Sequence, residues 1–379
     1  MRFVCNRCKR EYSEEEAGWR CSCGGCLFAE RQIHFTKEDI RTERPGMWRY
    51  DAAYPLKYED IAVTYGEGLT PLVSCPSGPC RLRLKLDCLM PTGSFKDRGT
   101  VMVVNYLLKR GAARIVEDSS GNAGASVAGY CALGRIPCDI FVPAGNSRGK
   151  LTQIRAYGAH IHPITGSRED AARAAQEYAE GYAGHNWHPM FLEGTKSLAY
   201  ELWEQNHFKA PENIVCVAGN GSQALGIFYG FQVLLENGQV ERLPRLFVVQ
   251  AENCSPIYRE FMRAAGEAAA AKTVAEAGEA AAKTMAEGIA LRSPNKGSEV
   301  VEAVQTTGGR VLAVSEEAIG QAVRELGKMG FYAEPTSAAA YAGLLELLRD
   351  RTLNEQSDVI LMISGNGLKA GEEIGEVIG

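Results

Sequence analysis

The sequence has no apolar run that approaches the roughly 20 residues needed to cross a bilayer. Its start, MRFVCNRCKR, also lacks the apolar core of a secretory signal peptide. A basic excess is missing too, since 41 lysines and arginines face 46 acidic residues for a net charge of -5. A nucleic-acid binder would usually carry a basic stripe. We therefore expect a cytoplasmic protein with no membrane or nucleic-acid partner.

Cysteines are concentrated at the start of the chain. Five of the 12 lie between Cys5 and Cys26, and in a reducing compartment they are expected to be thiols or metal ligands rather than disulfides. The spacing Cys5-x2-Cys8-x12-Cys21-x-Cys23 resembles a zinc ribbon, in which four thiolates close the coordination sphere of a structural metal. Cys26 could replace Cys23 as the fourth ligand. The alternative to both is a set of reduced, unmetallated cysteines.

The length of 379 residues suggests about two domains. After about residue 65, short apolar runs alternate with segments that have the i, i+3/i+4 spacing of helices. This order is typical of parallel sheets covered by helices. It predicts strands at ARIVE (113–117), CDIFV (138–142), IVCVA (214–218), LFVVQ (246–250), VLAV (311–314) and VILMI (359–363), and helices over 100–110, 122–133 and 169–182. Gly111 is expected to end the first helix, and Ser167 with Asp170 to cap the third.

Lys96 lies in Pro91-Thr92-Gly93-Ser94-Phe95-Lys96-Asp97-Arg98-Gly99, where a Gly-Ser turn leads into the first predicted helix. The positive end of the helix dipole disfavours an ammonium ion there and favours the neutral amine that attacks an aldehyde. The alternative is an ordinary solvated lysine paired with an acid. Without other information the residues favour that alternative.

Two more loops follow predicted strands and open helices. In Ser119-Ser120-Gly121-Asn122-Ala123-Gly124, the glycines let backbone approach a flat ligand, and Asn122 and Ser120 can bond a ring oxygen and a carboxylate. In Ala218-Gly219-Asn220-Gly221-Ser222-Gln223, consecutive N–H groups at a helix start can hold a phosphate. Either could also be a plain strand-to-helix turn. The residues 219–224 fit a dinucleotide fingerprint as well, so a dinucleotide-binding oxidoreductase is an alternative.

Ser364 ends the last predicted strand, before Gly365-Asn366-Gly367. A neutral hydroxyl at this place could meet a ring nitrogen, or it could simply cap a turn. His185 and His188 could suggest a metal, but no third ligand stands near them in the sequence. We therefore expect the two histidines to form hydrogen bonds in a pocket.

Taken together, these segments resemble the threonine synthases, which belong to the tryptophan-synthase-like (fold type II) family of pyridoxal phosphate enzymes. The resemblance covers nearly the whole chain. It lies in the cysteine spacing and in GEGLTPL (66–72), SFKDRG (94–99), SSGNAG (119–124), EPTSAA (334–339) and SGNGLK (364–369). Such a set in this order is highly specific, and it reverses the preference for ordinary turns and a solvated lysine.

The resemblance implies an α/β protein with two α/β domains of mostly parallel sheets, preceded by a zinc-ribbon-like module at residues 1–30. It implies a large cofactor domain at 31–90 and 200–379, and a smaller domain at 91–199. Lys96 would hold pyridoxal phosphate as a Schiff base and shuttle protons.

Further residue roles follow from the same resemblance. Asn122 would bond the cofactor's ring hydroxyl oxygen, and Ser364 would face the pyridine nitrogen. The cofactor phosphate and the substrate carboxylate would be held by two groups: Gly219, Asn220, Gly221 and Ser222 for the phosphate, and Thr92, Ser94 and Ser120 for the carboxylate.

One segment departs from the family pattern. Threonine synthases usually carry Asn-Ser-x-Asn-Pro-x-Arg, whose arginine binds the phosphate of O-phosphohomoserine, but here HNWHPMF (185–191) places Phe191 at that position. A phenyl ring cannot pair with a phosphate. Arg148 and Lys150 could compensate, and His188 could bond a smaller polar group.

Two reactions therefore stay open within the family. One is threonine synthesis from O-phosphohomoserine. The other is β-elimination or β-replacement on serine, threonine or O-phosphoserine by a paralogue. In either case we expect a homodimer that acts on a small amino acid.

Overall fold

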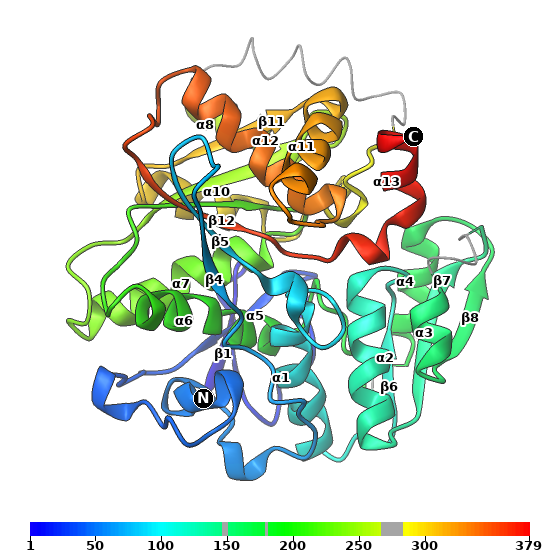
Figure 1. Cartoon of the computed structure of the whole chain (residues 1–379). Coiled ribbons are helices and arrows are strands. Elements are labelled where there is room, and N and C mark those ends of the chain that lie inside the picture. Colours follow the sequence, from blue (N-terminus) through cyan, green and yellow to red (C-terminus); the bar gives the residue numbers. More distant parts are fainter. Residues whose placement is uncertain (146–150, 179–180, 267–282) are drawn as a thin grey trace. The chain divides into compact units, whose positions relative to one another are not determined.

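The computed structural model describes residues 1–145, 151–178, 181–266 and 283–379 (Figure 1). The chain forms two compact units: unit 1 comprises Met1–Leu69 and Met90–Ser197, and unit 2 comprises Thr70–Leu89 and Leu198–Gly379. Each unit contains its own parallel sheet. Among the residues described, no helix is long and apolar enough to span a bilayer.

Unit 1 begins with a small antiparallel sheet of order β2-β1-β3. Its strands are β1 (Arg2–Cys5), β2 (Glu11–Ser13) and β3 (Leu27–Glu30). Phe3 and Cys5 alternate with more exposed residues along β1, which is the pattern of a strand with one buried face. With strands this short, the module has few apolar residues to bury.

The second sheet of unit 1 is parallel, with order β6-β7-β8. Helix α2 connects β6 to β7 along the chain, as in a βαβ unit. The strands and helices are β6 (Ile115–Glu117), β7 (Cys138–Pro143), β8 (His160–Ile164), α1 (Lys96–Lys109), α2 (Asn122–Gly134), α3 (Thr152–Ala156), α4 (Arg168–Gln176) and α5 (Pro189–Thr195).

The predicted helix ends in unit 1 are largely confirmed. Ser167 and Asp170 form the expected capping box of α4, and Gly111 follows α1 with a φ of 86°, a backbone conformation that favours glycine. However, α4 ends at Gln176, earlier than the sequence pattern indicates. The reason is tertiary, because Tyr182 forms a parallel bridge with Val116 of β6 and is held in extended backbone.

Residues 31–69 differ from the expected domain division, since they group with unit 1 and only 70–89 group with unit 2. Hydrogen bonds to α1 and α2 explain this. The Asn105 side chain bonds the backbone N–H groups of Ala62 and Val63 at 2.8 and 2.9 Å, and Tyr130 donates its hydroxyl to the buried Glu67 at 2.8 Å.

Unit 2 contains a six-stranded sheet of order β11-β10-β9-β12-β5-β4, parallel except for the antiparallel edge strand β4. Its strands are β4 (Leu72–Cys75), β5 (Arg81–Lys85), β9 (Asn213–Val217), β10 (Arg245–Ala251), β11 (Arg310–Val314) and β12 (Asp358–Met362). The helices are α6 (Ser197–Gln205, which starts at the boundary), α7 (Ser222–Glu236), α8 (Pro256–Ala264), α10 (Gly297–Thr306), α11 (Glu316–Lys328), α12 (Pro335–Arg349) and α13 (Gly371–Ile378).

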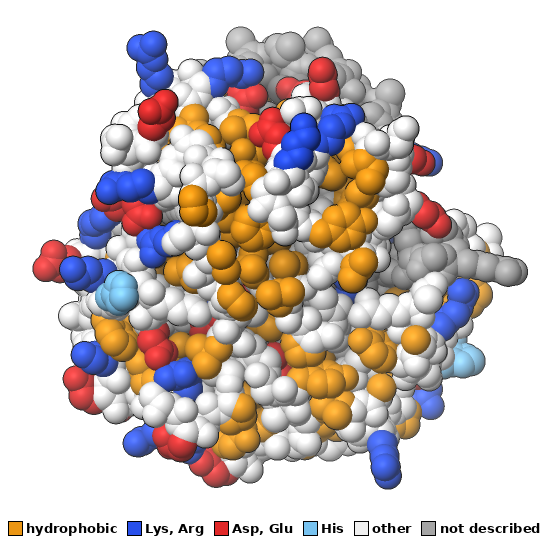
Figure 2. Space-filling view, in the orientation of Figure 1, with side chains coloured by type: hydrophobic (Ala, Val, Ile, Leu, Met, Phe, Trp, Pro, Cys, Tyr) orange, Lys and Arg blue, Asp and Glu red, His pale blue; other side chains and the backbone are white. Residues whose placement is uncertain are grey.

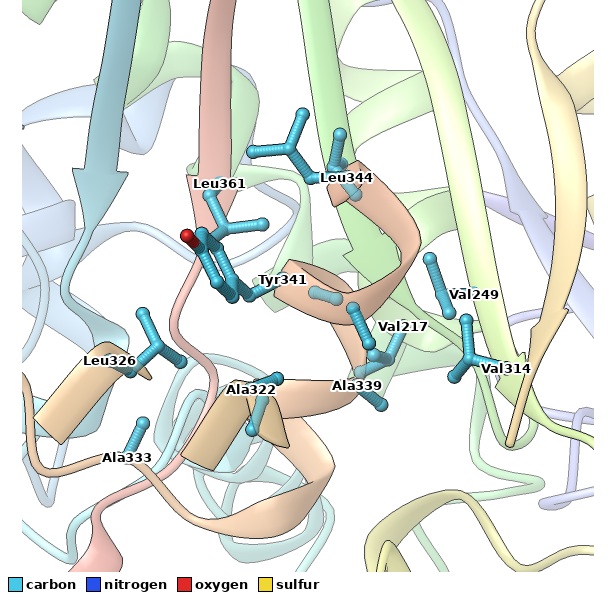
Figure 3. Packing of buried hydrophobic residues seen from close by; sticks show 14 of the residues in the cluster. Val217, Val249, Val314, Ala322, Leu326, Ala333, Ala339, Tyr341, Leu344 and Leu361 are labelled. Atoms are coloured by element: carbon cyan, nitrogen blue, oxygen red, sulfur yellow. The ribbon is translucent and has the colours of Figure 1, made fainter. Parts of the chain in front are cut away.

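The core of unit 2 forms where α12 packs on the sheet (Figure 3). Tyr341 and Leu344 of α12 meet Val249 and Leu361 of the strands there. Gly343 allows the close approach, because a Cβ atom at this position would lie 2.3 Å from a methyl group of Val249. Each fully buried aliphatic side chain stabilises the fold by about 1.5–3 kcal/mol relative to an exposed one. The predicted α/β fold with mostly parallel sheets is therefore confirmed.

Unit 2 also exposes apolar surface. Leu89, Tyr332 and Leu368 are 57%, 48% and 81% exposed, and they line a shallow hollow together with Phe331 and Ile363. Figure 2 shows apolar side chains gathered on the face that it views.

Candidate active site

Lys96 is the first residue of α1, and its amine lies close to two aromatic rings. Its Nζ atom is 4.8 Å from the centre of the Phe95 ring and 5.5 Å from that of Phe191. The N–H dipoles of a first helical turn oppose a positive charge. The position therefore favours the neutral amine, as a covalent nucleophile requires.

Phe191 is held against the first turn of α1 because two glycines let α5 approach closely. A Cβ atom at Gly99 would lie 2.6 Å from carbon atoms of the Phe191 ring, and one at Gly194 would lie 1.9 Å from the carbonyl oxygen of Arg98. Phe191 itself is 2% exposed. The position at which the family pattern has an arginine is thus apolar core beside Lys96.

The loop before α2 is shaped by its first serine and its last glycine. A Cβ atom at Gly124 would lie 1.8 Å from the carbonyl oxygen of Ser119, so a larger residue does not fit. The hydroxyl of Ser119 accepts the N–H of Gly121 at 3.3 Å. Ser120 and Asn122 remain partly exposed, and they are the polar side chains of the loop that a ligand can reach.

Thr92 and Ser94 precede Lys96, and both are buried. Thr92 donates its hydroxyl to Asp97 at 2.5 Å, and Ser126 donates to the same carboxylate oxygen at 2.6 Å. The Thr92 hydroxyl is thus used within the fold, and its role toward the substrate carboxylate stays a prediction. The Ser94 hydroxyl, by contrast, is buried with no hydrogen-bond partner in the described part of the chain.

Two acids stand at the carboxyl end of β6. Glu117 is fully buried, with Oε1 3.0 Å from Nδ1 of His185, and its Oε2 accepts the His185 backbone N–H at 3.2 Å. Burial raises the pKa of Glu117, and hydrogen bonds from Asp118 and from the His185 backbone act in the opposite direction. Asp118 accepts the hydroxyl of Tyr182 at 3.0 Å. Burial first, and the Glu117 charge second, raise the pKa of Asp118 to about 6.

The sequence analysis missed Glu117 and Asp118. A signal was available, because two adjacent acids end an otherwise apolar strand, and buried acids are rare unless they are paired or functional. It expected both histidines to form hydrogen bonds in a pocket, with His188 as a candidate substrate contact. His188 caps α5, since its Nδ1 accepts the N–H of Met190 at 3.3 Å. A substrate contact of His188 stays a prediction.

In unit 2, β9 leads through 218–221 into α7. Gly221 has a φ of 90°, and a Cβ atom there would lie 2.2 Å from a methyl group of Val300. Asn220 ties the loop to the segment before α10, because its Oδ1 accepts the N–H of Asn295 at 2.7 Å. Gln223 is buried, and both polar atoms of its amide lack a partner in the described part of the chain.

Ser364 lies just beyond β12 and is 1% exposed. Its hydroxyl oxygen is 3.0 Å from that of Ser337. Ser337 accepts the N–H of Gly365 at 2.9 Å, and its own hydrogen can go either to the Gly365 carbonyl oxygen at 3.3 Å or to Ser364. In the second case Ser364 can donate its hydrogen to a ring nitrogen. Ser337 belongs to EPTSAA (334–339), a motif to which the sequence analysis gave no role.

The four predicted zinc ligands lie together, with the sulfurs of Cys5, Cys8, Cys21 and Cys23 all within 4.8 Å of one another. The pairs Cys5–Cys23 and Cys8–Cys21 are each 3.5 Å apart. Tetrahedral zinc, with Zn–S bonds of about 2.3 Å, would space its sulfurs about 3.8 Å apart. Cys26 is not part of this cluster, which favours Cys23 as the fourth ligand.

The loop between these cysteines contacts the segment that carries His185. The ring of Trp19 lies 4.8 Å from that of Tyr182 and 5.8 Å from that of Trp187. The guanidinium of Arg20 lies over the ring of Trp19 at 4.3 Å. The N-terminal module is thus packed on the rest of unit 1.

Two other predicted site residues, Arg148 and Lys150, lie outside the described residues. Of the remaining predicted site residues, unit 1 carries the cysteines, Thr92, Ser94, Lys96, Ser120, Asn122 and His188, and unit 2 carries 219–222 and Ser364.

Comparison with known proteins agrees with the motifs. Residues 63–365 match the model of a family described as pyridoxal-phosphate dependent enzyme. The threonine synthase of Methanocaldococcus jannaschii is 30% identical over 96% of this chain and 92% of its own length. That of Methanosarcina acetivorans is 32% identical over 98% of this chain and 93% of its own length.

Solved structures share the fold. Maize serine racemase superimposes with a TM-score of 0.65 at 22% identity, covering 79% of this chain and 88% of that one. A fungal L-serine ammonia-lyase from Rhizomucor miehei gives a TM-score of 0.67 at 21% identity, covering 82% of this chain and 98% of that one.

Proposed function

Because the chain belongs to the family of pyridoxal-phosphate dependent enzymes, we propose that it is a lyase that eliminates or replaces a group on the β or γ carbon of a small amino acid. Its curated relatives, which cover nearly all of the chain, are threonine synthases. The family match also sets aside the dinucleotide-binding alternative for residues 219–224.

The described residues fit the cofactor. Lys96 supplies an amine at a helix start, and a helix start with a glycine loop, 219–222, supplies backbone N–H donors for a phosphate. Buried polar groups are rarely left without partners, yet the Gln223 amide beside this loop and the Ser94 hydroxyl near Lys96 both lack one in the described part of the chain. Orphaned groups at these places are what a site completed by a polar ligand requires.

Bound pyridoxal phosphate would supply an electron sink for the negative charge that develops at the substrate's α carbon. Lys96 would hold the group and, once released by the substrate, its amine would take the α proton. Asn122 would bond the ring hydroxyl oxygen, and Ser364 would donate to the ring nitrogen without charging it. Ser94 and Ser120 would hold the substrate carboxylate.

We infer the substrate class from the position of Phe191. This side chain is buried against α1, and the centre of its ring lies 5.5 Å from the Lys96 amine. A phosphate dianion entering an enclosed site needs cationic or several N–H partners, because leaving it unpaired costs several kcal/mol. Phe191 offers none of these partners. We therefore infer that the substrate carries no phosphate on its side chain.

Product analysis tests this inference. Serine, threonine, O-phosphoserine and O-phosphohomoserine are offered to the purified enzyme, and keto acids and new amino acids are measured. We expect the unphosphorylated substrates to be used with kcat/KM at least about tenfold higher, equivalent to roughly 1.4 kcal/mol of transition-state binding. Efficient threonine formation from O-phosphohomoserine that is lost in Arg148→Ala would contradict the inference, since it would show that the phosphate site has moved.

We also propose that Cys5, Cys8, Cys21 and Cys23 hold one structural zinc. Their clustered sulfurs support this, and a module with so little core needs a metal to be stable. Elemental analysis should find about one zinc per chain. The double change of Cys5 and Cys8 to serine should lower the unfolding midpoint and leave the absorption band of the bound cofactor unchanged. A metal content near zero in the unaltered protein would contradict the proposal.

A further inference from the structure

The buried pair of Glu117 and His185 joins two segments that are 68 residues apart in the chain. Glu117 is fully buried and His185 is 7% exposed. Two contacts fix the pair, from the backbone N–H and from Nδ1 of His185 to the two carboxylate oxygens. With Nδ1 directed at the carboxylate, the imidazole exchanges its proton through Nε2. This is the arrangement in which a carboxylate orients a histidine for acid–base work.

The pair lies in the same part of unit 1 as Lys96. The ring of His185 is 5.9 Å from that of Phe191, and the ring of Phe191 is 5.5 Å from the Lys96 amine. The ring of Phe191 thus lies within 6 Å of both the Lys96 amine and the imidazole of His185, at the position that the family pattern reserves for phosphate recognition.

The chemistry of the leaving group explains why a histidine would replace a phosphate site. A phosphate departs as a stable anion and needs no added proton. A hydroxyl group is a poor leaving group unless an acid protonates it as the bond breaks. A positioned general acid typically contributes about 10²–10⁴-fold to such a step.

We propose that His185 is the general acid that protonates the departing hydroxyl of the substrate, and that Glu117 is its positioning residue. As Lys96 takes the α proton, the electron pair of that bond forms the Cα–Cβ double bond. The Cβ–O bond breaks, its electrons stay on oxygen, and the oxygen takes the proton of His185 and leaves as water. Nothing is oxidised or reduced. The inference rests on the proposed function and names its substrate class, amino acids with a β-hydroxyl group.

Leaving-group dependence tests the proposal. The holoenzyme and its variants are assayed with serine or threonine, whichever is used better, and with β-chloroalanine, whose chloride leaves without a proton. In His185→Asn we expect kcat for the hydroxylated substrate to fall about 10²–10⁴-fold, as for loss of a general acid, and that for β-chloroalanine to fall less than about tenfold. The matched control is His160→Asn, on the exposed start of β8, which should change neither rate.

Glu117→Gln provides a second variant if His185→Asn folds poorly. Removing the carboxylate makes the imidazolium a stronger acid, so the alkaline limb of the kcat profile for the hydroxylated substrate should move to lower pH. The β-chloroalanine profile should keep its position. Cofactor absorption in each variant shows whether the site is intact.

Equal losses for both substrates in His185→Asn, with an unshifted profile in Glu117→Gln, would overturn the proposal and leave the pair a purely structural role. A different outcome marks failure of the proposed function itself. In that case the unaltered holoenzyme would show cofactor absorption but would eliminate from neither substrate.

Discussion

Besides Lys96, unit 1 contributes ionisable side chains to the candidate site: the two acids at the end of β6 and the imidazole of His185. The residues of unit 2 that we propose to bind the cofactor, the loop 219–222 and Ser364, are all neutral. The difference follows from what each set must do. Proton transfer needs groups whose charge can change, whereas a fixed anion is best held by preorganised N–H and O–H dipoles.

Lys96→Ala should have the largest effect, because it removes the group that carries the covalent chemistry in unit 1. Turnover should fall by at least about 10³-fold, as for other covalent catalytic residues. Borohydride reduction followed by peptide mapping should place the pyridoxyl adduct on Lys96 of the unaltered protein. An adduct on Lys369 of unit 2 instead would remove unit 1 from the covalent chemistry and contradict the comparison, and one on Lys196 would move that chemistry to another residue of unit 1.

Gly221→Ala tests the loop 219–222 of unit 2, which we propose to bind the cofactor phosphate. Its φ of 90° opposes a side chain, and the new methyl group would lie 2.2 Å from Val300. Losing one N–H bond to a charged phosphate costs roughly 1.5–3 kcal/mol, so cofactor affinity should fall about tenfold or more. Gly238→Ala is the matched control, with a φ of 67° but no atom within 4 Å. It should lower stability slightly and leave cofactor binding intact. Equal effects of the two changes on cofactor affinity would show that backbone strain, and not loss of phosphate binding by the loop 219–222, causes the fall in affinity.

Asp118→Asn should give the smallest effect, visible in the pH dependence of stability. The pKa of Asp118 is raised to about 6, so the folded state favours the protonated acid. The pKa of this acid in the unfolded chain is about 4. The contribution of Asp118 to stability is therefore complete below about pH 4 and is lost as the pH rises through about 6.

Relative to the unaltered protein, the free energy of unfolding of the asparagine variant should therefore rise by on the order of 1–2 kcal/mol when the pH is raised from 4 to 7.5. Urea unfolding at the two pH values measures this gain. The exposed Asp60→Asn serves as control and should change stability by less than about 1 kcal/mol at either pH. A constant difference for Asp118→Asn at both values would mean that the acid is ionised throughout, and unit 1 would then hold a permanent charge.

Much of the fold could be predicted because local patterns report local structure. The six predicted strands, the start of α1 at the Gly-Ser turn and the capping box at Ser167 all depend on residues within a few positions of one another. The placement of 31–69 in unit 1 could not be predicted in this way. It depends on Asn105 and Tyr130, which bond residues more than 40 positions away.

The candidate site likewise contains residues that local sequence patterns predicted and residues that only tertiary contacts bring together. The motifs around Lys96, Asn122, Gly221 and Ser364 are contiguous, so the sequence by itself determined the family, the cofactor and the residues expected to hold it. Glu117 and His185 meet only because β6 and the chain after Tyr182 run side by side. Phe191 reaches Lys96 only because Gly99 and Gly194 let α5 press against α1. The surroundings of Lys96, on which the proposed substrate class rests, were decided by tertiary packing, because a buried ionisable group acquires its partner through contacts that no local pattern encodes.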